Sequence, residues 1–184
     1  MIVLGIDPGS HRTGYALLEA GPERCVLRDF GTLELSSRAR HGERLAELYA
    51  RLLELIRSHR PEVCALEMPV YGKNPQAMLK LGRAQAAAML AAVHEGVPVV
   101  EYPPTEIKKA ATGRGNASKE QVWQTLHALL GLGSRWQRPT ADASDALAVA
   151  YCHVRRHYLA SGSRRGWWAF VQAHPDRVLP PARP

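Results

Sequence analysis

The sequence predicts an α/β fold, in which a mixed five-stranded β-sheet is flanked by α-helices. Three apolar, strand-like segments follow one another closely at the start of the chain, and short links of this kind favour antiparallel pairing. Two further short strands come later, each preceded by a segment with helical periodicity, which favours parallel pairing. The predicted strands span residues 1–7, 13–20, 24–35, 62–69 and 97–102.

The first predicted strand, "MIVLGID", is apolar and is followed by "PGS", a sequence typical of a turn. The next two strands, joined near "GPE", complete an antiparallel meander. A helix then follows, because Leu45, Leu48, Leu52 and Ile56 recur at helical spacing. Pro61 prevents this helix from continuing.

In the second half of the chain, Glu67 lies near the end of the fourth strand. Asn74 and Pro75 are a favourable N-cap and first-turn pair, and they predict a helix over 75–94. After the fifth strand come a short helix, a basic loop containing glycine, and a helix that begins after Ser118. The last helix begins with the sequence "ADASDALAVA".

The length of 184 residues suggests one domain, predicted here over residues 1–160. Residues 161–184 contain four prolines and no sustained period, so they are predicted to form a C-terminal tail that is partly disordered. Trp167, Trp168 and Phe170 in this tail have no assigned role.

The net charge of +7 is expected for a protein that binds a polyanion, most naturally a nucleic acid. A basic solvated surface without a ligand is an equally ordinary explanation. The three cysteines lie far apart without a CxxC pair, which argues against a zinc thiolate site and fits a reducing compartment. No signal peptide and no membrane-length apolar segment are evident, so a cytoplasmic location without membrane contact is expected.

Acidic residues stand at the ends of predicted apolar elements. Asp7 ends the first strand, Glu67 ends the fourth, and Asp142 and Asp145 lie one turn apart at the start of the last helix. Taken singly, each has an ordinary explanation: a turn residue, a surface acid, or a helix cap that favours the positive end of the helix dipole.

Together the four acids point to a metal site. An unpaired carboxylate among apolar neighbours costs several kcal/mol, whereas the helix dipole offsets at most ~2 kcal/mol. An all-oxygen ligand set suits Mg²⁺ or Mn²⁺ rather than zinc. Four carboxylates suffice for two ions about 4 Å apart, the arrangement that clamps the attacking and leaving oxygens during phosphodiester cleavage.

Four segments resemble the RuvC family of bacterial Holliday junction resolvases: "LGIDPGSHRTGYAL", "LEMPVYGKN…LKLGRAQ", "GRGNASKEQV" and "ADASDALAVA". The likeness runs in the same order from Met1 to about His157. It implies a ribonuclease H-like fold, with a five-stranded mixed sheet flanked by helices, in agreement with the strand order above.

The resemblance implies a crossover junction endodeoxyribonuclease whose catalytic and metal-binding residues are Asp7, Glu67, Asp142 and Asp145. It implies two Mg²⁺ or Mn²⁺ ions per site, with Asp7 bridging them. It further implies a homodimer that nicks two opposed strands of a four-way DNA junction during recombination and repair, leaving 5′-phosphate and 3′-hydroxyl ends. The RuvA and RuvB branch-migration proteins would be its partners.

The same resemblance implies that Lys108 and Lys119 lie near the scissile phosphate. Arg114 lies beside Lys119 in a loop that is expected to approach the DNA backbone. Further phosphate contacts are expected, by proximity to these motifs, from Lys73, Lys80, Arg83 and Lys109.

Two positions depart from the family pattern. The family often carries a base-stacking aromatic residue three positions after the catalytic glutamate, where this chain has Val70, and Tyr71 follows as the expected stacking residue. Some relatives have histidine in place of Asp142, so Asp145 is expected to matter more.

Three other functions remain open from the sequence. An actin- or hexokinase-like phosphotransferase shares the "IDPGSHRTG" pattern but needs a second domain. A junction-binding protein without activity does not need four acids. A YqgF-type ribonuclease keeps the fold and changes the substrate. Finally, the helix over 75–94 is a candidate dimer contact because of its small side chains, with packing inside one subunit as the alternative.

Overall fold

The computed structural model describes residues 1–21, 24–69, 74–133, 136 and 139–173, with side-chain surroundings given as far as Tyr158. The elements follow the predicted order of three strands, a helix, a strand, a helix, a strand and three helices. Their bounds are β1 Ile2–Asp7, β2 Arg12–Ala20, β3 Cys25–Glu34, α1 His41–His59, β4 Val63–Glu67, α2 Pro75–His94, β5 Val99–Tyr102, α3 Pro104–Thr112, α4 Lys119–Leu129 and α5 Ala141–Ala173.

The five strands form one mixed sheet in the order β3-β2-β1-β4-β5. β1 pairs antiparallel with β2, and β2 with β3, as expected for strands with short links. β4 is parallel to both β1 and β5. The predicted fold class is therefore confirmed. The carboxyl ends of β1, β4 and β5 meet at one edge of the sheet, which is where the functional site is built.

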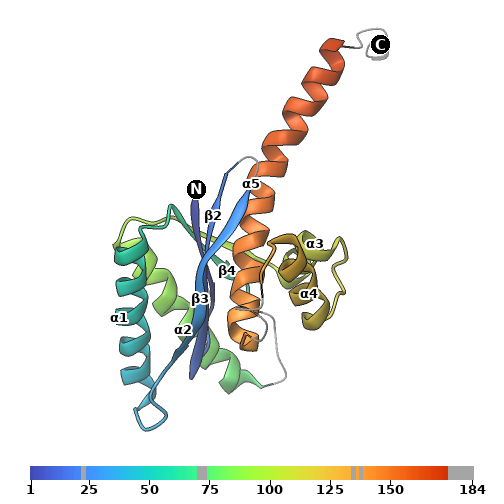
Figure 1. The fold of residues 1–184 in the computed structure, drawn as a ribbon. Helices are drawn as coiled ribbons and strands as arrows, with labels where there is room; N and C mark the ends of the chain where they lie inside the picture. Colours follow the sequence, from blue (N-terminus) through green and yellow to red (C-terminus); the bar gives the residue numbers. More distant parts are fainter. Residues whose placement is uncertain (22–23, 70–73, 134–135, 137–138, 174–184) are drawn as a thin grey trace, which may run out of the picture.

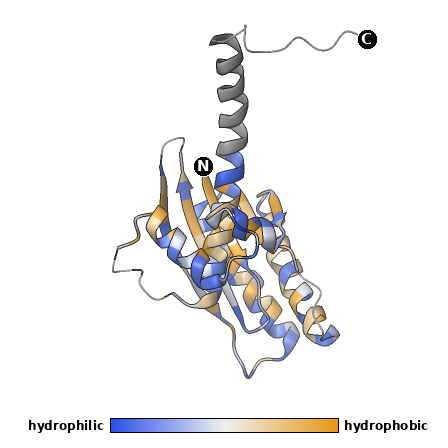
Figure 2. Cartoon of the chain, turned by 90° about the vertical axis from the view of Figure 1, so that its right-hand side faces the viewer, coloured by the Kyte–Doolittle hydropathy of each residue, from blue (hydrophilic) through white to orange (hydrophobic). Residues whose placement is uncertain are grey.

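Helices cover both faces of the sheet (Figure 1). α1 and α2 pack on one face around a core that includes Leu48, Leu52 and Leu66. α3, α4 and α5 lie on the other face, where the first part of α5 crosses β1 and β2 around a second core that includes Leu147. Figure 2 shows the apolar residues concentrated in the strands and in the first part of α5. The sheet is therefore packed between two separate hydrophobic cores.

Local signals in the sequence fix where several helices begin. The Asn74 side chain accepts a hydrogen bond from the Ala77 amide, with Pro75 in the first turn of α2. Ser118 caps α4 in a capping box with Gln121. Both caps were predicted. The three cysteines are free thiols, and Cys64 and Cys152 are buried.

α5 continues as a helix to Ala173, well past residue 160. The division into a domain over 1–160 and a tail over 161–184 stays a prediction. In the parts of the chain that the structure describes, no helix is both long and apolar enough to cross a membrane.

Candidate active site

Two neighbouring parallel strands bring Asp7 and Glu67 together. Ile6 of β1 is in register with Leu66 of β4, so the next residue on each strand is an acid. Both acids stand at the carboxyl edge of the sheet and line one cavity of about 230 Å³. The walls of this cavity are Asp7, Pro8, Glu67, Met68, Pro69, Leu81 and Gln85.

The start of α5 approaches this edge because the strands beneath it carry glycine. A Cβ atom on Gly14 would lie 1.9 Å from the Asp142 carbonyl oxygen, and one on Gly5 would lie 2.2 Å from the Ala146 carbonyl oxygen. Asp7 pairs with Gly14 across β1 and β2. Glycine at these positions therefore lets the helix backbone rest directly on the sheet, with the α5 acids beside Asp7.

Asp142 is not the cap of α5. The Thr140 hydroxyl accepts a hydrogen bond from the Ala143 amide at 3.2 Å and fills that role. Asp142 and Asp145 lie in the first turns, half-buried, where the helix dipole favours negative charge. The capping explanation for Asp142 is thus excluded, and its carboxylate is available for another task.

The electrostatics of Asp7 reflect the gathering of acids. The pKa of Asp7 is raised to about 7. Burial is the largest cause, and the negative charge of Asp145 is the second. Glu67 and Asp142 act in the same direction, and Lys119 opposes them. Burial, followed by the charge of Asp145, also raises the pKa of Glu67. Side chains that share one pocket with like charge behave in this way.

Lys119 neutralises part of this charge from the α5 face of the sheet. Its ammonium group donates a hydrogen bond to the Asp145 carboxylate. Burial is the largest single effect and lowers the pKa of Lys119, but the hydrogen bond to Asp145 and the charges of Asp145, Asp7 and Glu67 together outweigh it, so the pKa is raised. A small cavity of about 40 Å³ is lined by Glu67, Lys108, Lys119 and Asp145 among other residues. Lys108 and Lys119 therefore lie beside the acids, and their contact with the scissile phosphate stays a prediction.

The donor set fits a hard divalent ion. Carboxylates from three separate elements meet at one edge, and burial together with their mutual repulsion raises the pKa of Asp7. Among the described residues, no three acidic, histidine or cysteine side chains are already arranged around a common metal position. The Asp145 carboxylate is instead paired with the Lys119 ammonium group.

The comparisons with known proteins agree with this geometry. The sequence profile of the family described as crossover junction endodeoxyribonuclease RuvC matches residues 3–153. This chain belongs to the RuvC family. A RuvC relative from Salinibacter ruber is 49% identical over 181 residues, covering 97% of this chain and 99% of the relative. A RuvC relative from Cytophaga hutchinsonii is 41% identical over 177 residues, covering 96% of this chain and 88% of the relative.

Solved structures of RuvC proteins share the fold. T. thermophilus RuvC in complex with a Holliday junction substrate matches with a TM-score of 0.80 and 33% identity, covering 87% of this chain and 96% of that chain. The yeast mitochondrial Holliday junction resolvase Ydc2 matches with a TM-score of 0.67 and 18% identity, covering 91% of this chain and 83% of that chain, and at that identity it supports the fold alone. The predicted resemblance to RuvC is confirmed.

Three of the remaining predicted DNA contacts lie in described parts of this RuvC-family fold. Lys80 and Arg83 are exposed on the first half of α2. Arg114 is exposed in the loop before α4, where its amide donates to the Thr112 hydroxyl. Tyr71 and Lys73 lie outside the described residues.

Sequence reasoning missed the residues that hold the loop after Asp7. Thr13 is fully buried, and its hydroxyl donates to the Gly9 carbonyl and accepts from the Gly9 amide, both at 3.2 Å. Gln85 is buried beside the acids, and its amide donates to Glu101. The close approach of α5 to the sheet was missed as well. The glycines within β1 and β2 were a signal for it, because glycine inside a strand often marks a close backbone approach.

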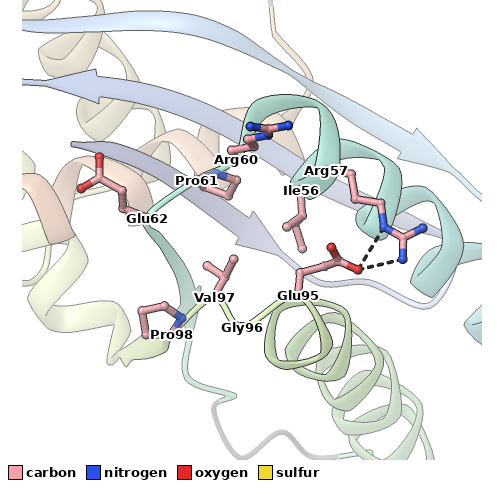
Figure 3. A pocket seen from close by; sticks show the side chains of 9 residues that line it. All are labelled: Ile56, Arg57, Arg60, Pro61, Glu62, Glu95, Gly96, Val97 and Pro98. Carbon is pink, nitrogen blue, oxygen red and sulfur yellow. Dashed lines mark hydrogen bonds and ion pairs between the residues drawn. The ribbon is translucent and has the colours of Figure 1, made fainter.

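A larger cavity, of about 480 Å³, lies at the opposite end of the sheet, where α1 ends and β4 begins (Figure 3). Arg57 donates to Glu95 there at 3.0 Å, so both charges are already paired. Neither the four acids of the candidate active site nor Lys108 and Lys119 line this cavity. Its size therefore does not make it the functional site.

Proposed function

We propose that this RuvC-family chain is a Holliday junction resolvase, an endonuclease that makes symmetric nicks in opposed strands of four-way DNA junctions. The observation that carries the proposal is the family match over residues 3–153, together with Asp7, Glu67 and Asp145 at one edge of the sheet. The carboxylates come from elements far apart in the sequence, and a lone surface acid does not explain the raised pKa values of Asp7 and Glu67.

The proposed catalytic and metal-binding residues are Asp7, Glu67, Asp142 and Asp145. They would hold two Mg²⁺ or Mn²⁺ ions. Bound ions supply Lewis-acid chemistry that activates water and stabilises a departing 3′ oxygen, so that the products carry 5′-phosphate and 3′-hydroxyl ends. The carboxylates must be ionised to act as ligands, and proton release from Asp7 is therefore part of site assembly.

The lysines on the α5 face have a separate role. Lys108 and Lys119 lie beside the acids and carry the positive charge that attracts and orients the scissile phosphate. The hydrogen bond from Lys119 to Asp145 must loosen for Asp145 to act as a ligand, and a DNA phosphate is the natural new partner for the ammonium group. Arg114, Lys80 and Arg83 are proposed backbone contacts, joined by Lys73 and by Tyr71 as a stacking platform.

Two opposed nicks require two active sites, so we propose a homodimer. α2 supports this proposal, because its outer face exposes apolar side chains that no described part of one subunit covers. In the second half of α2, Leu90 is 50% exposed and Val93 58%. The proposed setting is the cytoplasm, with RuvA and RuvB as the branch-migration partners.

The proposal is tested by incubating the protein with a synthetic four-way junction, a linear DNA duplex and an RNA duplex, with and without Mn²⁺. We expect paired nicks in the junction only, and only with the metal. Equal cleavage of the linear duplex would indicate a general nuclease. Cleavage of RNA alone would indicate a ribonuclease of the same fold, and either result would overturn the proposal.

A further inference from the structure

A cluster of basic side chains lies at the same end of the sheet as the acids, on the α1–α2 side. Its members come from three separate parts of the chain: the loop after β1, the first turns of α1, and α2. The cluster consists of His11, His41, Arg44, Lys80 and Arg83. The other four side chains each lower the pKa of His41 through their charge, so they lie near it.

Arg44 is the buried member and holds the cluster together. It is only 8% exposed, although it carries a permanent charge. Its guanidinium donates to the Ser10 carbonyl at 3.0 Å and to the Ala39 carbonyl, so it ties the loop after β1 to the segment before α1. Carbonyl groups are neutral, and no described acid forms an ion pair with Arg44. A nearly buried cation without a counter-ion is costly, and an anionic ligand would relieve that cost.

His41 points to the same conclusion. Both of its ring nitrogens are shielded from solvent, and neither has a hydrogen-bond partner among the described protein atoms. Loss of water lowers the pKa of His41, and Arg44, Arg83, Lys80 and His11 lower it further. An imidazole without partners among cations is suited to take up a proton when an anion arrives.

The basic side chains of this cluster have no carboxylate partner among the described residues. Several other arginines, including Arg28, Arg40 and Arg57, form ion pairs with carboxylates. None of the described acids pairs with His11, His41, Lys80 or Arg83. The positive charge of the cluster is therefore not cancelled by a neighbouring carboxylate, and it is available to a polyanionic ligand.

The position of the cluster relative to the acids indicates its use. Pro8 lines the cavity with Asp7, while Ser10 and His11, two and three residues further on, belong to the basic cluster or contact it. Lys108 and Lys119 flank the acids from the α5 face, and the basic cluster flanks them from the α1–α2 face. A DNA strand that crosses the edge of the sheet would meet positive charge on both sides of the scissile phosphate.

We propose that His11, His41, Lys80 and Arg83, organised around Arg44, bind a backbone phosphate of the junction DNA on the α1–α2 side of the acids. This inference rests on the proposed resolvase function and adds a phosphate site to it. The site positions the strand and does not touch the reacting atoms. The bound phosphate stabilises the imidazolium form of His41, so the site binds more tightly in acid than in base.

The test measures junction affinity in the Asp7→Asn background without divalent ions, which prevents cleavage and removes the titration of Asp7 from the readout. The variants are His41→Ala, Lys80→Gln and Arg83→Gln. The matched controls are His59→Ala, at the other end of α1, and Arg24→Gln, at the opposite end of the sheet. Kd is measured across about pH 6 to about pH 8 and across a salt series, with circular dichroism to check folding.

We expect each of the three variants to weaken binding about 3- to 10-fold, the effect of removing one ordinary hydrogen-bond donor, and to reduce the salt slope by about 0.9 for each phosphate that the variant no longer neutralises. His41→Ala additionally flattens the pH dependence relative to His59→Ala. If His41→Ala does not fold, the Kd and the salt slope of the exposed Lys80→Gln and Arg83→Gln variants test the phosphate site. Variants that match the controls in Kd, pH dependence and salt slope would overturn the phosphate site. Failure of the Asp7→Asn parent to prefer the junction over linear duplex would instead count against the proposed function.

Discussion

Asp7 is the residue on which the site depends most. Its strand is buried, its neighbours are acids, and its pKa is raised to about 7 from the ordinary value of 3.8. The folded protein therefore holds this proton more tightly than the unfolded chain does. Between these two pH values the metal-free fold loses stability as the pH rises, because folding then opposes ionisation.

This sign leads to a prediction for the metal-free protein. The free energy of unfolding of the wild type should fall as the pH rises from about 4 to about 7 and level off above, with Asp7 contributing at most ~4 kcal/mol. The Asp7→Asn variant should show a flatter profile and be more stable than the wild type at about pH 8. Urea denaturation with a chelator at a series of pH values measures both curves. If the stability curves of the wild type and Asp7→Asn ran parallel against pH, the pKa of Asp7 would not be raised by folding.

A second prediction separates chemistry from binding at the same residues. Asp7→Asn, Glu67→Gln and Asp145→Asn should each reduce the rate of junction nicking at least ~100-fold, since each removes a proposed metal ligand. Junction affinity should stay close to that of the wild type, because the proposed phosphate contacts are basic side chains, which these variants leave in place. Nicking and gel-shift assays on the same preparations provide the measurement. Loss of binding in all three variants would indicate a structural role instead.

Single residues also show how far the sequence predicts the site. Asp7 and Glu67 were predictable, because an acid at the end of a buried strand is visible in the pattern. Thr140 as the cap of α5 was not predicted, since Asp142 offered an equally good cap. Arg44 and His41 were not predicted either, because basic residues at the start of an amphipathic helix are usually solvated, and only tertiary contacts bury them.

At the scale of elements, the decisive contact is the one between α5 and the first two strands. The element order and the mixed sheet were predictable from periodicity and link length. The depth at which α5 sits was not, because it depends on which strand glycines face the helix. Gly5 and Gly14 face it, and an added Cβ atom at either would overlap the helix backbone.

Gly14→Ala tests this contact. The added methyl group should push the first turn of α5 away from the sheet, lower stability by about 1–3 kcal/mol and reduce nicking by displacing Asp142 and Asp145. Gly133→Ala is the matched control, because nothing lies within 4 Å of its added Cβ atom. Chemical denaturation and a nicking assay report the two effects. If Gly14→Ala and Gly133→Ala had the same stability and the same nicking rate, the close approach of α5 to the sheet would not matter for activity.

At the scale of the whole molecule, the sheet separates two tasks. Its carboxyl edge gathers acids and cations, whereas the outer face of α2 presents apolar side chains to solvent. The small residues of this helix were predicted to form either a dimer contact or internal packing. Alanines such as Ala84, Ala88 and Ala91 do pack inside the subunit, which leaves the larger exposed side chains for a second copy.

The dimer proposal leads to a prediction for α2. Leu90→Glu should convert the dimer into a monomer, because a charge in the centre of an apolar contact loses its water without gaining a partner. Leu129→Glu on α4 is the control, since Leu129 is 55% exposed on a different helix. Light scattering at micromolar concentration gives the mass of each variant. A wild type that is already monomeric, or a Leu90→Glu variant that stays dimeric, would contradict the proposed interface.

The central claim is that carboxylates from β1, β4 and α5 hold divalent ions at the carboxyl edge of the sheet. Anomalous X-ray diffraction from crystals grown with Mn²⁺ tests it most directly. We predict two anomalous peaks beside Asp7, with Glu67 and Asp145 within ligand distance and the Lys119 ammonium group released from Asp145. Manganese bound elsewhere, with Asp145 still paired to Lys119 at saturating metal, would contradict this account.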